Sequence, residues 1–256
     1  MKTLIALIFH NFFPVVIIFY LLGSVVSIYR RPEAGAAIFL VGFFLHTLFL
    51  LSRGLITGVW MPNLIIDSTY FLPWAMGAIC LAMRLSSGHE HGKAVSRGLF
   101  MAVVVFSLPA LFLHREIMPP GPRHETFFVP LYYGIDILAQ AFFLLGAWLA
   151  VAHLKGKDPH RFFTSFLIAG FVFYSISQVV GAYWAYLGWA LPMHWSTKHL
   201  QSASIWCYYA AVLHGRYLPA WNSRQEARFA IAGAALLLVF IYSAQAKAFR
   251  IPGMEG

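Results

Sequence analysis

The sequence predicts an all-α integral membrane protein with eight transmembrane helices, and three observations indicate this class. Of the 256 residues, 60% are hydrophobic and 11% are charged, whereas a soluble domain carries about 25% charged residues. The mean hydropathy is +0.72. Uncharged apolar runs of about 20 residues, the length that crosses a hydrocarbon core, recur along the chain. Eight such helices leave only short loops, so we expect residues 1–256 to form a single membrane domain.

The first expected helix covers residues 4–29. Its apolar run is too long for the core of a signal peptide, and Arg30, Arg31 and Pro32 follow it where a cleavage site would need small residues. The later apolar runs are separated by segments that carry Lys and Arg. The other seven expected helices cover residues 34–53, 69–84, 98–114, 130–153, 162–187, 201–217 and 229–247.

Lys and Arg are distributed unevenly between the two ends of these helices. If the amino terminus is outside, the inner loops hold eleven of the 18 Lys and Arg residues and the outer segments hold seven. The positive-inside rule therefore predicts that both termini lie on the outer, periplasmic side. The longest outer loops then cover residues 54–68, 115–129 and 188–200, and their prolines indicate loops folded over the outer face. The net charge of +9 reflects this topology, and the lack of a contiguous basic face excludes a nucleic acid partner.

The two cysteines, Cys80 and Cys207, both fall in apolar segments. They supply neither a disulfide framework nor a Cys-rich metal site. The chain also lacks a Cys-x-x-Cys-His sequence, so we expect any bound haem to be non-covalent.

Two histidines lie well inside expected helices, His46 in the second and His214 in the seventh. An imidazole in an apolar core costs free energy unless its nitrogens find partners. From the helical rise, His46 lies roughly 15 Å and His214 roughly 20 Å below the outer ends of their helices. Two histidines at matching depth on facing helices can ligate a haem from both sides. The alternative is that each bonds to a neighbouring Ser, Thr or backbone carbonyl, and the spacing alone does not decide between the two.

Tryptophans are concentrated in a Trp-rich outer loop, residues 181–200. Trp184, Trp189 and Trp195 fall within twelve residues, and such indole rings can line an aromatic slot for a flat ring such as a porphyrin or a quinone. The polar residues that could meet the edge of that ring are His194, Lys198 and His199. Other tryptophans are more typical of an interfacial belt, namely Trp60, Trp74, Trp148 and Trp221.

Residues 181–216 resemble the tryptophan-rich signature of the CcsA/CcmC haem-handling family of cytochrome c assembly proteins. The matching residues are Gly181, Ala182, Trp184, Ala185, Trp189, Trp195, Lys198, Trp206, Leu213, His214 and Arg216. An earlier stretch is similar to the amino-terminal region of CcsA, with Leu45, His46, Thr47, Gly58, Pro62, Asn63, Leu64, Asp67 and Ser68. The resemblance implies a CcsA-like fold in a bacterial or archaeal cytoplasmic (inner) membrane. It also implies that His46 and His214 are the two axial ligands of one bis-histidine haem b.

The chain departs from the family pattern at the outer face. The acidic residues that follow the last tryptophans of the signature are absent, and residues 196–199 are Ser, Thr, Lys and His. Asp136 stands where the family has one outer histidine, and no histidine follows His214 to supply the other. Substitute outer ligands, and with them a second outer haem, are conceivable among His114, His124, His194 and His199.

A chain that has lost the outer site and kept the buried haem is suited to electron transfer, because both axial positions of the iron are filled. We therefore predict the membrane subunit of a larger oxidoreductase complex, passing electrons between the quinone pool and periplasmic c-type cytochromes, including multihaem ones. Asp67 and Asp136 are the candidate acceptors of quinol protons; the alternative for each is a helix cap or an ion pair with an arginine. The expected partners are membrane lipid, quinone, c-type cytochromes and other subunits. Two alternative functions stay open: a haem delivery factor for cytochrome c assembly and a non-redox scaffold subunit.

Overall fold

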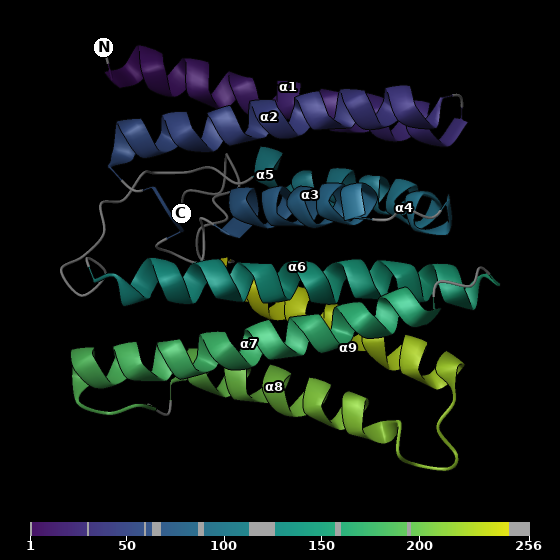
Figure 1. Ribbon diagram of the computed structural model, residues 1–256. Helices are drawn as coiled ribbons and strands as arrows, with labels where there is room; N and C mark the ends of the chain where they lie inside the picture. The colour runs from purple at the N-terminus through teal and green to yellow at the C-terminus, as the bar shows by residue number, and fades with distance from the viewer. Residues whose placement is uncertain are drawn as a thin grey trace, which may run out of the picture. The chain divides into compact units, whose positions relative to one another are not determined.

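The computed structural model describes residues 2–29, 31–58, 60–62, 68–86, 90–112, 126–156, 160–193 and 196–245. Every regular element in these ranges is an α-helix (Figure 1), which confirms the predicted fold class. The helices are α1 (Lys2–Tyr29), α2 (Pro32–Thr57), α3 (Ser68–Ser86), α4 (Glu90–Ser107), α5 (Pro109–Phe112), α6 (Phe128–Leu154), α7 (His160–Trp189), α8 (Thr197–Gly215) and α9 (Ser223–Gln245).

Six of the described helices are long and apolar enough to cross a membrane, namely α1, α2, α4, α6, α7 and α9. The polytopic membrane class is therefore confirmed. The remaining expected spans coincide with α3, a shorter apolar helix, and with α8, whose first turns carry Lys198, His199 and Gln201. The count of eight spans and the outer position of the termini stay predictions. The expected span 98–114 covers two helices, because Pro109 cannot continue the hydrogen-bond ladder of α4.

The structure divides into two compact units, and the single membrane domain over residues 1–256 stays a prediction. The first unit comprises residues 1–61 and 69–117, with α1, α2, α4, α5 and nearly all of α3. The second comprises residues 62–68 and 118–256, with α6 to α9.

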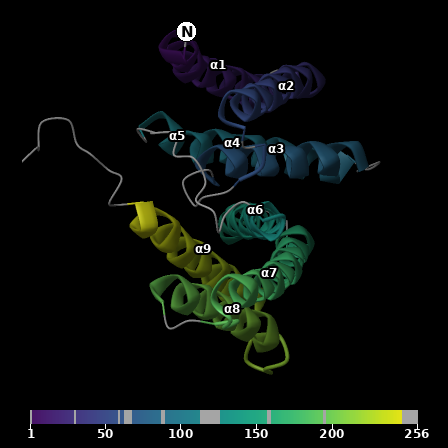
Figure 2. The same ribbon diagram turned by 90° about the vertical axis from the view of Figure 1, so that its left-hand side faces the viewer.

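In the first unit, α1 and α2 run side by side, as both views show (Figures 1 and 2). Glycines permit this close approach: a Cβ on Gly23 would lie 2.6 Å from the Phe39 backbone nitrogen, and one on Gly35 would overlap Ser27. Small residues drive helix association in this way where lipid offers no hydrophobic driving force.

Aromatic and polar contacts attach α3 and α4 to α2. The Phe39 and Phe100 rings stack with centroids 4.0 Å apart, which joins α2 to α4. The Trp74 indole nitrogen donates to the Thr47 hydroxyl at 3.0 Å and joins α3 to α2. These contacts hold the middle of α2 inside the unit.

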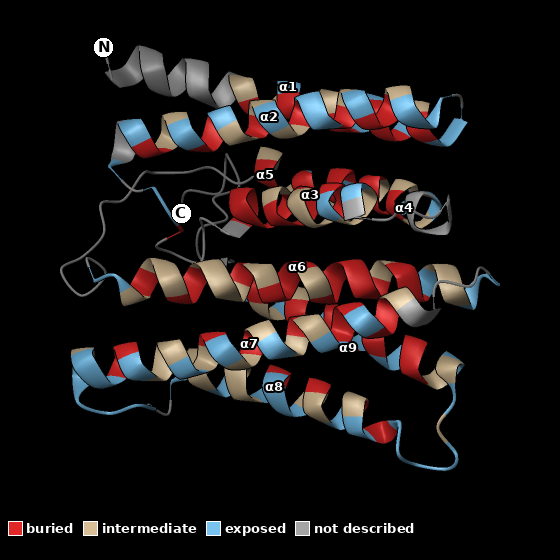
Figure 3. Cartoon of the chain, in the orientation of Figure 1, coloured by how far each residue is buried: buried red, intermediate tan, exposed pale blue. Residues whose placement is uncertain are grey.

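In the second unit, α6 is the central helix. Most of its residues are buried (Figure 3), and α7 packs along it. Phe143 of α6 stacks on Tyr209 of α8 with centroids 3.6 Å apart. Between α7 and α9, the Thr164 hydroxyl donates to a Glu226 carboxyl oxygen at 3.1 Å. A buried polar group is tolerated here because it is hydrogen-bonded.

Local signals set several helix ends. Pro32 occupies the first turn of α2, where its missing N–H costs nothing, and Gly58 ends that helix with φ 73°. Asn222, directly before α9, and Gln225, in its first turn, exchange side chain-to-backbone hydrogen bonds of 2.9 and 3.0 Å, the reciprocal arrangement of a capping box. Ser196 caps α8 by accepting from the His199 backbone nitrogen.

Candidate functional site

His46 lies in the middle of α2 and is fully buried. Its Nδ1 atom is 3.1 Å from the Tyr20 hydroxyl of α1. The rings of Phe13 and Phe49 flank the imidazole, with centroids 5.3 and 6.2 Å away. The histidine is thus held from one side by a hydrogen bond and enclosed by aromatic rings of its own unit.

The second imidazole nitrogen of His46, Nε2, is buried and has no partner at hydrogen-bonding distance among the described residues, and the backbone of Tyr70 in α3 also interacts with the imidazole. A buried polar atom without a partner costs free energy, so it calls for an explanation. Metal-ligating histidines combine these two features: one nitrogen is bonded to a neighbouring group, and the other keeps its lone pair for the metal. The surroundings of His46 therefore fit a haem ligand.

His214 lies in the last turn of α8 and is exposed on its unit. Its Nδ1 is 2.7 Å from the Ala210 carbonyl oxygen. Because a carbonyl can only accept, Nδ1 carries the proton in this hydrogen bond and Nε2 is left with its lone pair. From the sequence, a hydrogen bond to a backbone carbonyl is the alternative to haem ligation for this histidine. The bond to Ala210 is compatible with both, because it leaves Nε2 available for a ligand. His46 and His214 belong to different units, so their pairing on one haem stays a prediction.

The expected aromatic slot is divided between a helix and a loop. Helix α7 extends to Trp189, so residues 181–189 of the expected outer loop are helical. Trp184 is buried against α6, with its ring centroid 6.1 Å from Tyr132 and 6.5 Å from Tyr133. Trp189 is 38% exposed and meets Trp184 edge-on at 5.5 Å. Trp189 is therefore the more accessible of the two indoles, while Trp184 is buried beside Tyr132 and Tyr133 in tilted ring contacts.

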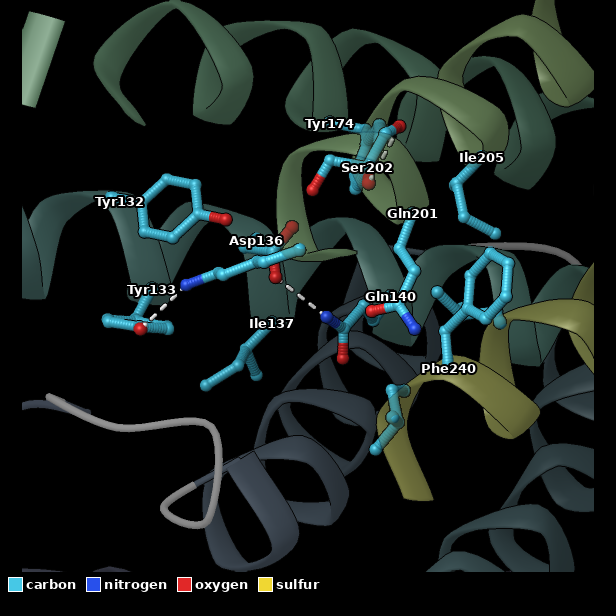
Figure 4. A pocket seen from close by; sticks show the side chains of 13 residues that line it. Tyr132, Tyr133, Asp136, Ile137, Gln140, Tyr174, Gln201, Ser202, Ile205 and Phe240 are labelled. Atoms are coloured by element: carbon cyan, nitrogen blue, oxygen red, sulfur yellow. Dashed lines mark hydrogen bonds between the residues drawn. The ribbon is translucent and has the colours of Figure 1, made fainter. Parts of the chain in front are cut away.

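A pocket that contains several polar side chains lies among α6, α7, α8 and α9 of the second unit (Figure 4). Asp136 lines it and accepts a 2.7 Å hydrogen bond from the Gln140 amide. Lys198 also lines it, donates to the Tyr133 hydroxyl at 2.8 Å and interacts electrostatically with Asp136. In place of the expected helix cap or arginine, Asp136 interacts with Gln140, Lys198 and the Ser177 side chain.

Sequence reasoning missed the tyrosine and glutamine members of this pocket. One sequence signal could have indicated them: Asp136 and Gln140 are four residues apart, so they lie on one face of an otherwise apolar helix that also carries Tyr132 and Tyr133. Their convergence with Lys198 depends on packing between helices 65 positions apart in sequence.

The other predicted site residues divide into described and undescribed ones. His199 lies in the first turn of α8, where its Nδ1 is 2.8 Å from the Ser196 hydroxyl. Among the described residues, no three His, Cys, Asp or Glu side chains come together as a metal cluster. Five predicted residues lie outside the described ranges: Asp67, His114, His124, His194 and Trp195.

The fold and these residues define a class: a polytopic helical membrane protein with a buried histidine whose second nitrogen has no partner in the described structure. The sequence model of the family described as "Cytochrome C assembly protein" matches residues 98–247. The chain belongs to this family.

Curated relatives are similar over most of the chain at low identity. A "Cytochrome c biogenesis protein CcsA" from Prochlorococcus marinus strain MIT 9312 is 24% identical over 236 residues, 76% of each chain. The protein of the same name from P. marinus subsp. pastoris strain CCMP1986 is 21% identical and covers 90% of this chain and 87% of its own. Another, from strain MIT 9515, is 33% identical over 73 residues, 28% of this chain and 23% of the relative. No solved structure matches.

These matches confirm the CcsA-like resemblance and mark the chain as a divergent member. They favour a haem-handling role in cytochrome c assembly over the predicted electron transfer, which they do not support.

Proposed function

We propose that this chain handles haem for cytochrome c assembly in a bacterial cytoplasmic membrane, with His46 and His214 as the axial ligands of a haem b. The observation that carries the proposal is the buried Nε2 of His46, which has no partner among the described residues. Family membership supplies the second support. The names of the similar CcsA proteins concern cytochrome c biogenesis, and we therefore prefer this role to electron transfer.

When bound, a bis-histidine haem supplies an iron with both axial positions filled, which favours storage or transfer of the haem over oxygen chemistry. The Tyr20 hydroxyl is 3.1 Å from Nδ1 of His46; with the ring proton on Nδ1 and the hydroxyl accepting it, Nε2 would keep a lone pair for a haem iron. The Ala210 carbonyl does the same for His214. Phe13 and Phe49 exclude water from the first histidine.

At the outer face, the exposed Trp189 offers an aromatic surface to a flat ring, and Lys198 and His199 offer polar contacts to its edge. A second haem there would need substitute ligands such as His199, because Asp136 is engaged with Gln140. The substrate proteins of this role are apocytochromes c, and further membrane-complex subunits are its expected partners.

The experiment is a deletion of the gene in its own host, complemented by plasmid copies of the wild type and of His46→Ala. Haem-stained gels of the membrane and periplasmic fractions measure covalently attached haem. We expect the wild type to restore c-type cytochromes and His46→Ala to leave less than about a tenth, since a missing ligand removes most metal affinity. His153→Ala, in the last turn of α6, is the matched control and should restore them. Full restoration by His46→Ala would refute the proposal.

A further inference from the structure

The pocket in the second unit is lined by both polar and apolar side chains. Its cavity volume is about 80 Å³, which limits a ligand to a small head group. Asp136 interacts with Gln140 and Lys198, and we call these three residues the polar end of the pocket. The polar Gln201 and Ser202 and the apolar Ile205 and Phe240 also line it (Figure 4). Such a site suits an amphiphile that enters from the membrane.

Two side chains at the polar end, Gln140 and Lys198, can make more hydrogen bonds than they make within the protein. The Gln140 amide nitrogen donates to Asp136, but the Gln140 carbonyl oxygen is buried and has no partner among the described residues. Gln140 itself is 8% exposed. The Lys198 ammonium has three protons and donates one to Tyr133. A complementary ligand must therefore donate to the Gln140 oxygen and accept from Lys198.

The charge of the pocket restricts the ligand further. Asp136 and Lys198 contribute one acid and one base, so the lining is balanced. A phosphate or carboxylate would add a second negative charge beside Asp136, and a cation would add a second positive charge beside Lys198. A neutral head group fits best.

Aromatic side chains form much of the wall. Tyr132, Tyr133, Tyr174 and Phe240 line the pocket, and their rings can pack on a flat ring in stacked or edge-on geometry. A hydroquinone with an alkyl tail is a neutral flat ring that carries hydroxyl groups and dissolves in a membrane.

We propose that this pocket binds the head group of a membrane quinol in its reduced form. One ring hydroxyl accepts a hydrogen bond from Lys198 and donates to the Gln140 oxygen or to Asp136. The oxidised quinone has no hydroxyl proton and leaves the Gln140 oxygen without a partner, so it binds more weakly. This inference is independent of the haem role of His46 and His214.

The test titrates the purified, delipidated full-length protein with decyl-hydroquinone under anaerobic conditions and measures Kd by calorimetry. The matched probe is the dimethyl ether of the same hydroquinone, which has equal rings and tail but no hydroxyl proton. We expect the hydroquinone to bind about tenfold more tightly than the ether, the effect of one hydrogen bond at a buried site. Equal affinity for the two probes, or no saturable binding of the hydroquinone, would overturn the proposal.

Substitutions in the pocket lining test whether the hydroquinone binds in this pocket. Gln140→Leu and Lys198→Met should each raise the Kd of the hydroquinone about tenfold. Gln178→Leu is the control, because Gln178 is a half-buried glutamine of α7 outside the pocket lining. Equal Kd values for Gln140→Leu and Gln178→Leu would refute the site. Haem content, measured on the same preparations, reports separately on the proposed haem function.

Discussion

Removing the Tyr20 hydroxyl tests how His46 is held. In Tyr20→Phe the ring still fills its buried position, but His46 loses its partner on Nδ1 while both residues remain fully buried. A buried group left without a partner costs about 1–3 kcal/mol. For chains of 150–250 residues each kcal/mol lowers Tm by about 2–4 °C, so we expect Tm to fall by about 2–12 °C. Thermal unfolding of the purified protein, followed by circular dichroism at 222 nm, measures the change.

Tyr209→Phe is the matched control for this substitution. Tyr209 is also fully buried, but its hydroxyl has no hydrogen-bond partner among the described residues. Its stacking on Phe143 survives the change, so Tm should stay the same or rise. Groups that orient a metal-ligating histidine contribute roughly 10–100-fold to metal affinity, so Tyr20→Phe should also lower haem occupancy and Tyr209→Phe should not. Equal Tm values for the two variants would refute this account of His46.

Further substitutions test the packing within each unit by the same unfolding assay. Gly35→Ala should destabilise the protein by about 1–3 kcal/mol, because the new Cβ overlaps Ser27 of α1. Gly134→Ala is the control and should not destabilise the protein, because nothing lies within 4 Å of its new Cβ. Equal losses of stability in the two variants would contradict the close approach of α1 and α2. Thr164→Val should cost about 1 kcal/mol by removing the hydrogen bond to Glu226, and Thr164→Ser should restore the stability; an unchanged Tm in Thr164→Val would show that this bond contributes nothing.

The helices could be predicted from the sequence because apolar runs of the right length leave few other structures in a membrane. The ends of the helices were harder to predict from the sequence. Helix α7 ends at Trp189, two residues beyond the expected end at residue 187, and Trp184 within its Trp-rich end packs on Tyr132 of α6. The break between α4 and α5 follows directly from Pro109 and its missing N–H.

The sequence predicts a site residue only where that residue is unusual by itself, without knowledge of its neighbours in the fold. A histidine inside an apolar helix is conspicuous, and His46 is buried as its position indicates. Its partner Tyr20 could not be found, because pairing between α1 and α2 depends on glycines whose effect is on packing distance and not on hydropathy. The pocket of Asp136 and Lys198 was hidden for the same reason, since periodicity describes single helices and not which helices meet.

The most direct test of the haem proposal is the haem content of the purified protein together with its reduced-minus-oxidised spectrum. We predict one b-type haem per chain in the wild type, with the absorption of a low-spin bis-histidine iron. That signal should disappear in His46→Ala and in His214→Ala and persist in His153→Ala. A wild type without haem, or a haem that keeps its spectrum and full occupancy in His46→Ala, would contradict the account.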